Sequence, residues 1–159
     1  MNEIFRILEQ DARKTPEQIA TMTGIPLAQV EETIKKAESD RTILKYKAMV
    51  NWDKLGEEQV CALVEVKVAP QRDVGFDAIA ERIYRFPEAR TAYLISGTYD
   101  LAVFVVGKTM HEVAGFVSEK LAPLEGVQGT VTHFLLKRYK EDGEIMDGEE
   151  GPKRVPIMP

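Results

Sequence analysis

The second half of this 159-residue chain alternates between two hydrophobic periodicities, and their order restricts the fold more than any other feature. Four segments carry the alternating or β-branched pattern of strands: residues 60–68, 90–96, 100–106 and 127–137. Two segments carry apolar residues at helical spacing instead: residues 76–85 and 110–121. Because the order is strand, helix, strand, strand, helix, strand, we predict an α+β domain with a split βαβ, ferredoxin-like sheet.

The third of these strands is apolar on both of its faces. Residues 101–106 read Leu-Ala-Val-Phe-Val-Val. The two predicted helices can cover only one face of the sheet, so we expect the other face to pack against a second copy of the chain. The sequence therefore predicts a homodimer.

The first 40 residues predict three short helices. Thr15, Pro16 and Gln18 form a favourable helix start with a capping box, Gly24 ends this second helix, and Pro26 opens the third. The apolar residues expected to face inward are Ile4, Ile7, Leu8 and Ala12, then Ile19, Ala20 and Met22, then Leu27, Val30, Ile34 and Ala37. Three short helices with a tight turn between the second and third predict a helix-turn-helix.

The pattern changes again on either side of the predicted sheet. Residues 42–50 are β-rich and predict a wing or a linking strand, followed by a hinge turn. From Lys140 the chain is acidic and then proline-rich, which is typical of a mobile tail, although Val155 and Ile157 offer an alternative edge strand for a neighbouring subunit. The predicted parts are a winged helix-turn-helix domain over 1–44, a linker strand and hinge over 45–58, a ferredoxin-like domain over 59–140 and a tail over 141–159.

Charge and composition restrict the partners and the compartment. The formal net charge of −5 weakly opposes nucleic-acid binding. The basic residues nevertheless cluster after the predicted turn, at Lys35, Lys36, Arg41, Lys45 and Lys47. A single cysteine, Cys61, excludes an intramolecular disulfide and a cysteine-based zinc site. No apolar run approaches the roughly 18–20 residues of a membrane span, so we predict a cytoplasmic protein with no membrane partner.

Several short motifs occur together in a definite order. They are residues 8–13, Gly24-Ile25 at the turn, residues 43–46 in the wing, Gly97-Thr98-Tyr99-Asp100 between the middle strands, and Gly126-Val127 with Thr130 and Thr132. In this order the chain resembles the Lrp/AsnC family, also called feast/famine regulators, over roughly residues 2–140. The resemblance implies a DNA-binding helix-turn-helix and a domain that binds an amino acid or related metabolite. It also implies dimers through that second domain, often stacked into tetramers or octamers.

The third predicted helix is the candidate for reading double-stranded DNA in the major groove. The candidate contacts are Gln29 for base edges, Thr33 for bases or phosphate, Lys35 and Lys36 for phosphates, and Lys45 and Lys47 from the wing. The chain departs from the family here, since Pro26 replaces the usual serine or threonine and Thr33 replaces a common arginine. Glu31 and Glu32 add negative charge. These departures leave open a degenerate helix-turn-helix that serves protein contacts or assembly.

The loop of residues 97–100 allows two interpretations. As a turn, Gly97 supplies the backbone geometry and Tyr99 packs at the sheet edge. As an effector site, Gly97 lets a ligand approach backbone N–H groups, Asp100 accepts from a ligand ammonium, and Tyr99 is a further candidate contact. The resemblance places this loop and a threonine of the last strand at subunit contacts that bind effector, which implies Thr132, with Thr130 as a weaker candidate. The same loop alternatively serves only to join two subunits.

Three functional hypotheses follow. The first is a transcriptional regulator in which a metabolite changes the spacing of paired recognition helices. The second is an effector-binding co-regulator with lost or weak DNA binding. The third is an enzyme, because sirohaem decarboxylases share the two-domain resemblance. The third is disfavoured because His111 and His133 lack metal-ligand spacing, and the nearby arginines lie around one helix and strand. We therefore expect a non-enzyme without cofactor or metal.

Overall fold

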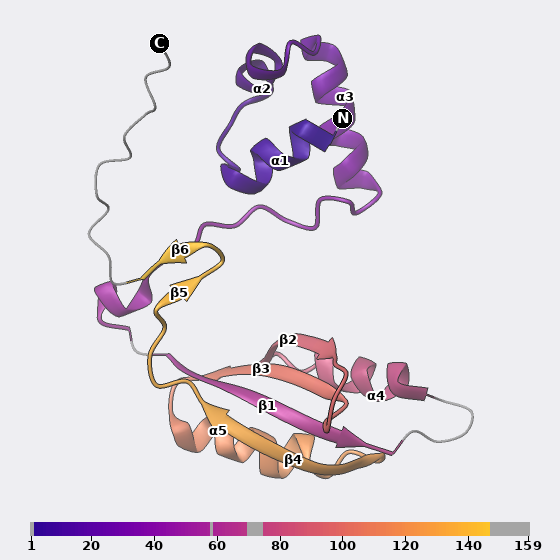
Figure 1. Ribbon diagram of the computed structural model, residues 1–159, viewed down its shortest axis with the longest axis vertical. Coiled ribbons are helices and arrows are strands. Elements are labelled where there is room, and N and C mark those ends of the chain that lie inside the picture. The colour runs from indigo at the N-terminus through magenta and orange to yellow at the C-terminus, as the bar shows by residue number, and fades with distance from the viewer. Residues whose placement is uncertain (1, 58, 70–74, 147–159) are drawn as a thin grey trace. The chain divides into compact units, whose positions relative to one another are not determined.

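The structure is a computed structural model that describes residues 2–57, 59–69 and 75–146 (Figure 1). The chain divides into two compact units, and the division falls between Val50 and Asn51. Within the described residues, none of the helices combines the length and the apolar character needed to cross a lipid bilayer.

The first unit consists of three helices: α1 (Asn2–Gln10), α2 (Pro16–Thr23) and α3 (Leu27–Ser39). Its core is small, with Ile4, Leu8, Ile19 and Val30 buried together. The capping box of α2 forms as predicted, since Thr15 N–H donates to Gln18 Oε1 (3.0 Å) and Gln18 N–H donates to Thr15 Oγ1 (3.4 Å). The helix-turn-helix prediction is confirmed.

Three apolar residues at helix ends were wrongly expected inside this core. Ala12 is exposed because α1 already ends at Gln10. Met22 and Leu27 are 58% and 39% exposed. They lie beside the turn between α2 and α3, where the small core does not reach them. The turn itself is as predicted, since Gly24 adopts a left-handed φ of 71° and its N–H donates to the Ala20 carbonyl.

The predicted wing and linker strand is not a strand in this structure. Residues 44–50 form no strand ladder. Two hydrogen bonds join this part of the chain to α3: Ile43 N–H donates to the Ala37 carbonyl (2.9 Å), and Tyr46 Oη donates to Glu38 Oε1 (3.0 Å). A β-rich sequence needs a neighbouring backbone to complete its hydrogen bonds. These residues meet none alongside them within the described chain, and Leu44 is 74% exposed.

The second unit is built on a four-stranded antiparallel sheet with the strand order β2-β3-β1-β4 (Figure 1). Its elements are η1 (Trp52–Leu55), β1 (Val60–Val68), α4 (Gly75–Tyr84), β2 (Ala89–Leu94), β3 (Leu101–Gly107), α5 (Met110–Phe116), its continuation η2 (Val117–Leu121), and β4 (Val127–Phe134). The ferredoxin-like βαββαβ prediction is confirmed. Alternate residues of β1 share one buried cluster with Ile79 of α4 and Phe116 of α5, so both helices cover the same face of the sheet.

Both edge strands contain an irregularity that interrupts their pairing. The register of β4 against β1 passes from Lys67↔Gly129 to Val68↔Val127 and so leaves out Gln128. The register of β2 against β3 leaves out Arg90 in the same way. One unpaired residue on an edge strand is the geometry of a β-bulge.

The segment after Lys140 was expected to be a tail, and for residues 140–146 this is wrong. Strands β5 (Lys140–Glu141) and β6 (Glu144–Ile145) form a hairpin. Asp142 and Gly143 turn it with φ values of 49° and 89°, the left-handed pair that an Asp-Gly turn provides. Met146 is buried, and its carbonyl accepts from Asn51 Nδ2 (3.1 Å). The alternative edge strand at Val155 and Ile157 lies outside the described residues.

Candidate nucleic-acid interface and effector site

Helix α3 presents a stripe of polar side chains away from the core of the first unit. Gln29, Thr33 and Lys36 follow one another at helical spacing, so they lie on one side of the helix. Gln29 and Lys36 are exposed. Thr33 is half-buried and its Oγ1 donates to the Gln29 carbonyl (2.7 Å), which leaves the hydroxyl oxygen as an acceptor. The structure brings these three predicted contacts together.

The other basic candidates are separated from this stripe to different degrees. Lys35 is exposed but projects about 100° around α3 from Lys36. Lys45 and Lys47 are exposed on the extended segment, on either side of Tyr46, whose hydroxyl is bonded to Glu38 of α3.

An acidic residue lies within the same stripe. Glu32 is three residues after Gln29 and four before Lys36, and it is exposed. The charge on this side of α3 is therefore mixed rather than uniformly basic.

The carboxylate of Asp100 is engaged inside its own subunit. Asp100 Oδ2 accepts from Val68 N–H (2.8 Å), and Lys67 Nζ lies 3.3 Å from Oδ1 and 3.2 Å from Oδ2. The backbone is tied as well, since Asp100 N–H donates to the Val66 carbonyl (3.0 Å). The Val68 N–H bond, together with the Lys67 ammonium, lowers the pKa of Asp100 below its ordinary value. Asp100 therefore joins the loop to the end of β1.

The remaining loop candidates are more accessible. Gly97 is exposed, has a φ of 136° and has open space where a side chain would begin. Tyr99 is half-buried. This part of the loop offers a backbone that a ligand can approach.

Thr132 lies on a different face of the sheet from Asp100. Thr132 pairs directly with Val64, which belongs to the buried core on the helix-covered face. Directly opposite residues project to the same face, whereas Lys67, the partner of Asp100, alternates to the other face. Within one chain the structure therefore does not bring Thr132 and Asp100 together.

The face of the sheet away from the helices, here called the open face, combines apolar residues with polar pairs. Leu63 and Phe104 are half-buried on it, and Tyr93 is 57% exposed. Glu65 Oε2 and His133 Nε2 lie 2.9 Å apart on the same face. A face of this composition can pack against another protein surface.

Sequence reasoning missed two contacts around these sites. Lys67 was not recognised as the partner of Asp100, although the alternation of residues 60–68 already placed its side chain on the uncovered face. Arg138 was also missed; its Nη2 donates to Cys61 Sγ (2.7 Å). No sequence signal links residues 77 positions apart. The described residues hold no cluster of three or more histidine, cysteine or acidic side chains that could bind a metal.

Comparisons with known proteins agree with this architecture. The family model for the Lrp/AsnC ligand binding domain matches residues 61–145. YugG of Bacillus subtilis, named as an uncharacterized HTH-type transcriptional regulator, is 48% identical over 158 residues, which cover 99% of this chain and 95% of that protein. The leucine-responsive regulatory protein of Rhizobium meliloti is 29% identical over 143 residues, 90% of this chain and 91% of that protein.

Solved structures share the fold at lower identity. The transcriptional regulator NMB0573 of Neisseria meningitidis, crystallised as a complex with L-Met, has a TM-score of 0.69 at 19% identity and covers 87% of this chain and 89% of its own. A feast or famine regulatory protein of Mycobacterium tuberculosis, Rv3291c, complexed with L-methionine, has a TM-score of 0.71 at 19% identity and covers 91% and 95%.

Proposed function

Since the chain belongs to the Lrp/AsnC family and is a transcriptional regulator, we propose that its first unit binds double-stranded DNA through α3 and that its second unit senses an amino acid or related metabolite. The observation that carries this proposal is the polar stripe of Gln29, Thr33 and Lys36 on one side of α3, in which Gln29 and Lys36 are exposed. Glutamine can bond an adenine edge bidentately, and lysine neutralises phosphate.

The start of α3 adds a second kind of contact. Pro26 occupies the N-cap without a side-chain hydrogen bond to the helix, where a serine or threonine would use one. Gln29 N–H donates to the Pro26 carbonyl (2.9 Å), which leaves the Leu27 and Ala28 N–H groups of the first turn for an outside acceptor, and a DNA phosphate at a helix N-terminus is one. The departure from the family at Pro26 is compatible with DNA binding on this view.

We propose a homodimer that forms through the open face of the sheet. Its half-buried Leu63 and Phe104 and its exposed Tyr93 would be covered by the same face of a second copy. The extended residues 44–50 would pair with a backbone segment of the second copy in the same dimer. Tetramers or octamers would then form by stacking dimers.

The effector is proposed to bind at the loop of residues 97–100 with contributions from two subunits. Gly97 and Tyr99 would contact it, and Asp100 would hold the loop in place because its carboxylate already accepts two donors. Thr132 would have to come from another subunit, because it lies on the other face of its own sheet. Methionine is a first candidate, since two structural neighbours were crystallised with it.

The test is a fluorescence anisotropy titration of the full chain against the DNA upstream of its own gene, at 50 and 200 mM salt, with and without an amino-acid panel. We expect binding that weakens steeply with salt, because phosphate contacts release counterions. Lys36→Gln should weaken binding and flatten the salt dependence, whereas the control Lys108→Gln, on the second unit, should do neither. Absence of binding at both salt concentrations would overturn the DNA-binding proposal.

A second candidate function is an effector-binding co-regulator with lost or weak DNA binding. Glu32 within the polar stripe of α3 favours it, because a carboxylate beside the contact residues repels phosphate. In this case an amino acid would change the assembly, measured by sedimentation velocity, while no DNA binding appears. The regulator names of the curated relatives support a non-catalytic role for this chain as well.

A further inference from the structure

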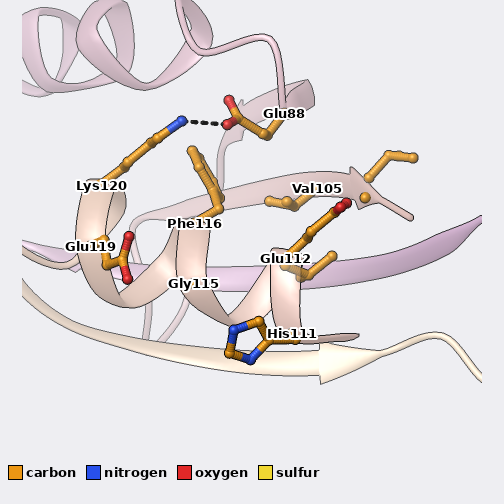
Figure 2. Close-up of a pocket in the computed structure, with 11 residues that line it drawn as sticks. Glu88, Val105, His111, Glu112, Gly115, Phe116, Glu119 and Lys120 are labelled. Carbon is orange, nitrogen blue, oxygen red and sulfur yellow. Dashed lines mark hydrogen bonds and ion pairs between the residues drawn. The ribbon is translucent and has the colours of Figure 1, made fainter. Parts of the chain in front are cut away.

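A cavity of about 340 Å³ lies on the helix-covered side of the sheet, against α5 (Figure 2). It is lined by the end of β3, by Glu88 immediately before β2, and by one side of α5 and η2. Gly107, the last residue of β3, is one of its lining residues. The loop of residues 97–100 precedes the opposite end of the same strand. The cavity is therefore separate from the proposed effector site.

The size and the apolar part of this cavity suit a small molecule. Its volume falls within the range of about 300–1,000 Å³ found for ligand pockets. Phe116 and Val113 provide an apolar floor and are themselves almost fully buried. Gly115 leaves the helix surface open there, since a side chain begun at this position would meet no atom within 4 Å.

The charged groups around the cavity are predominantly acidic. Glu88, Glu112 and Glu119 line it, against a single lysine, Lys120 (Figure 2). His111 is the other titratable lining residue. With three carboxylates and one ammonium, the lining carries a net charge of about −2 when the histidine is neutral.

One of these carboxylates has an unsatisfied oxygen. Glu88 Oε1 pairs with Lys120 Nζ, and this hydrogen bond lowers the pKa of Glu88, so that the group is ionised at neutral pH. Glu88 Oε2 is buried and has no hydrogen-bond partner among the residues that the structure describes. This oxygen has almost no accessible surface, so a ligand in the cavity would interact with Glu88 through the charge of its carboxylate rather than through a hydrogen bond to Oε2.

We propose that this cavity binds a small organic ammonium ion with an aliphatic body. Its ammonium group would be attracted by the carboxylates of Glu88, Glu112 and Glu119, while its methylene groups pack on Phe116. The negative lining would disfavour a zwitterionic amino acid, because the carboxylate of such a ligand would be repelled. The proposal is independent of DNA binding and of the amino-acid effector.

The test is isothermal titration calorimetry of the full chain at pH 7 with three probes of similar length: 1,5-diaminopentane, pentylamine and L-norleucine. We expect the diamine to bind most tightly, the monoamine less tightly and norleucine at least about tenfold more weakly than the monoamine. Absence of diamine binding at millimolar concentration would overturn the proposal. Norleucine binding as tight as pentylamine binding to the same cavity would overturn the ligand class.

Two variants locate the binding. Glu88→Gln keeps the shape of the side chain but removes its charge, and Gly115→Leu fills the cavity from a position with open space. Each should weaken diamine binding at least about tenfold. The matched control is Glu81→Gln, which removes a carboxylate that pairs with Arg85 outside the cavity and should leave binding unchanged. Circular dichroism checks the fold of each variant, and unchanged binding in both folded cavity variants would place the amine elsewhere and overturn the proposal.

Discussion

The two units of this protein use their polar side chains in opposite ways. On α3 the candidate contacts Gln29 and Lys36 are exposed at the helix surface. In the loop before β3, the most conspicuous candidate, Asp100, is bonded to Val68 and Lys67 of its own sheet. Substitutions on α3 should therefore act on binding first, whereas substitutions at Asp100 should act on stability first.

The units also differ in how much core supports them. The first unit buries four residues in its central cluster, and the second buries thirteen among its described residues. Small cores leave little margin above the unfolding threshold. Truncation of one core side chain should therefore show most clearly that the two units differ in stability.

The largest effect is expected for Ile19→Ala, at a core position of the first unit that is fully buried. Truncation of a buried isoleucine costs about 2–5 kcal/mol, which is enough to unfold a unit of this size. Differential scanning calorimetry should show the loss of one transition while that of the second unit remains, together with loss of DNA binding. Ile83→Ala in the larger core is the matched variant and should lower the other transition. Loss of both transitions in Ile19→Ala would show that the units do not fold independently.

A smaller loss of stability, confined to the second unit, is expected for Asp100→Asn. Folding lowers the pKa of Asp100 below its ordinary value of 3.8, so its ionised form stabilises the folded state above that pH. This contribution is lost as the pH falls through the lowered value. Thermal unfolding followed from pH 7 to pH 2 should show the second unit of the variant less stable at pH 7 and less sensitive to acid. Equal acid sensitivity of variant and wild type would contradict the structural role of Asp100.

The hairpin after β4 should respond to Gly143→Ala with a local loss of about 1 kcal/mol, because φ at this position is 89°. Hydrogen exchange of the Met146 amide, which donates to the Tyr139 carbonyl, should become faster. The sheet core and DNA binding should stay unchanged. Exchange as slow as in the wild type would mean that the turn tolerates a side chain.

The smallest effect is expected for Glu32→Gln. Removal of this carboxylate from the polar stripe of α3 should tighten DNA binding by roughly threefold at low salt, the size of one exposed charge interaction. The anisotropy titration measures it, with Glu81→Gln on the second unit as the control for a change in net charge. An unchanged or weaker affinity would show that Glu32 does not face the DNA.

Sequence patterns predicted those elements whose signal is local. The alternation of residues 60–68 coincides with β1, and the Thr15–Gln18 capping box formed as expected. Asp142-Gly143 is an equally local hairpin signal. It was overlooked because the surrounding acidic residues suggested a tail. Periodicity thus predicted most of the fold, and greater weight on turn chemistry would have predicted this part of it too.

Features that depend on distant partners were not predictable in the same way. Residues 44–50 have the composition of a strand, yet whether they pair depends on a second backbone that the local sequence does not specify. The donors to Asp100 come from Lys67 and Val68, more than 30 positions earlier, and the side of the sheet on which Thr132 lies follows from its pairing with Val64. Composition identified the candidate residues. The register of the strands was needed to show that Thr132 and Asp100 lie on different faces of the sheet.

The bulges at Arg90 and Gln128 protect the chain against edge-to-edge aggregation of its sheets. An uninterrupted edge strand is a template on which another chain can add, and repeated addition leads to fibrils. Here each edge is broken by one unpaired residue, while the two central strands stay regular. Growth of the sheet by addition of further chains is thereby hindered at both of its edges.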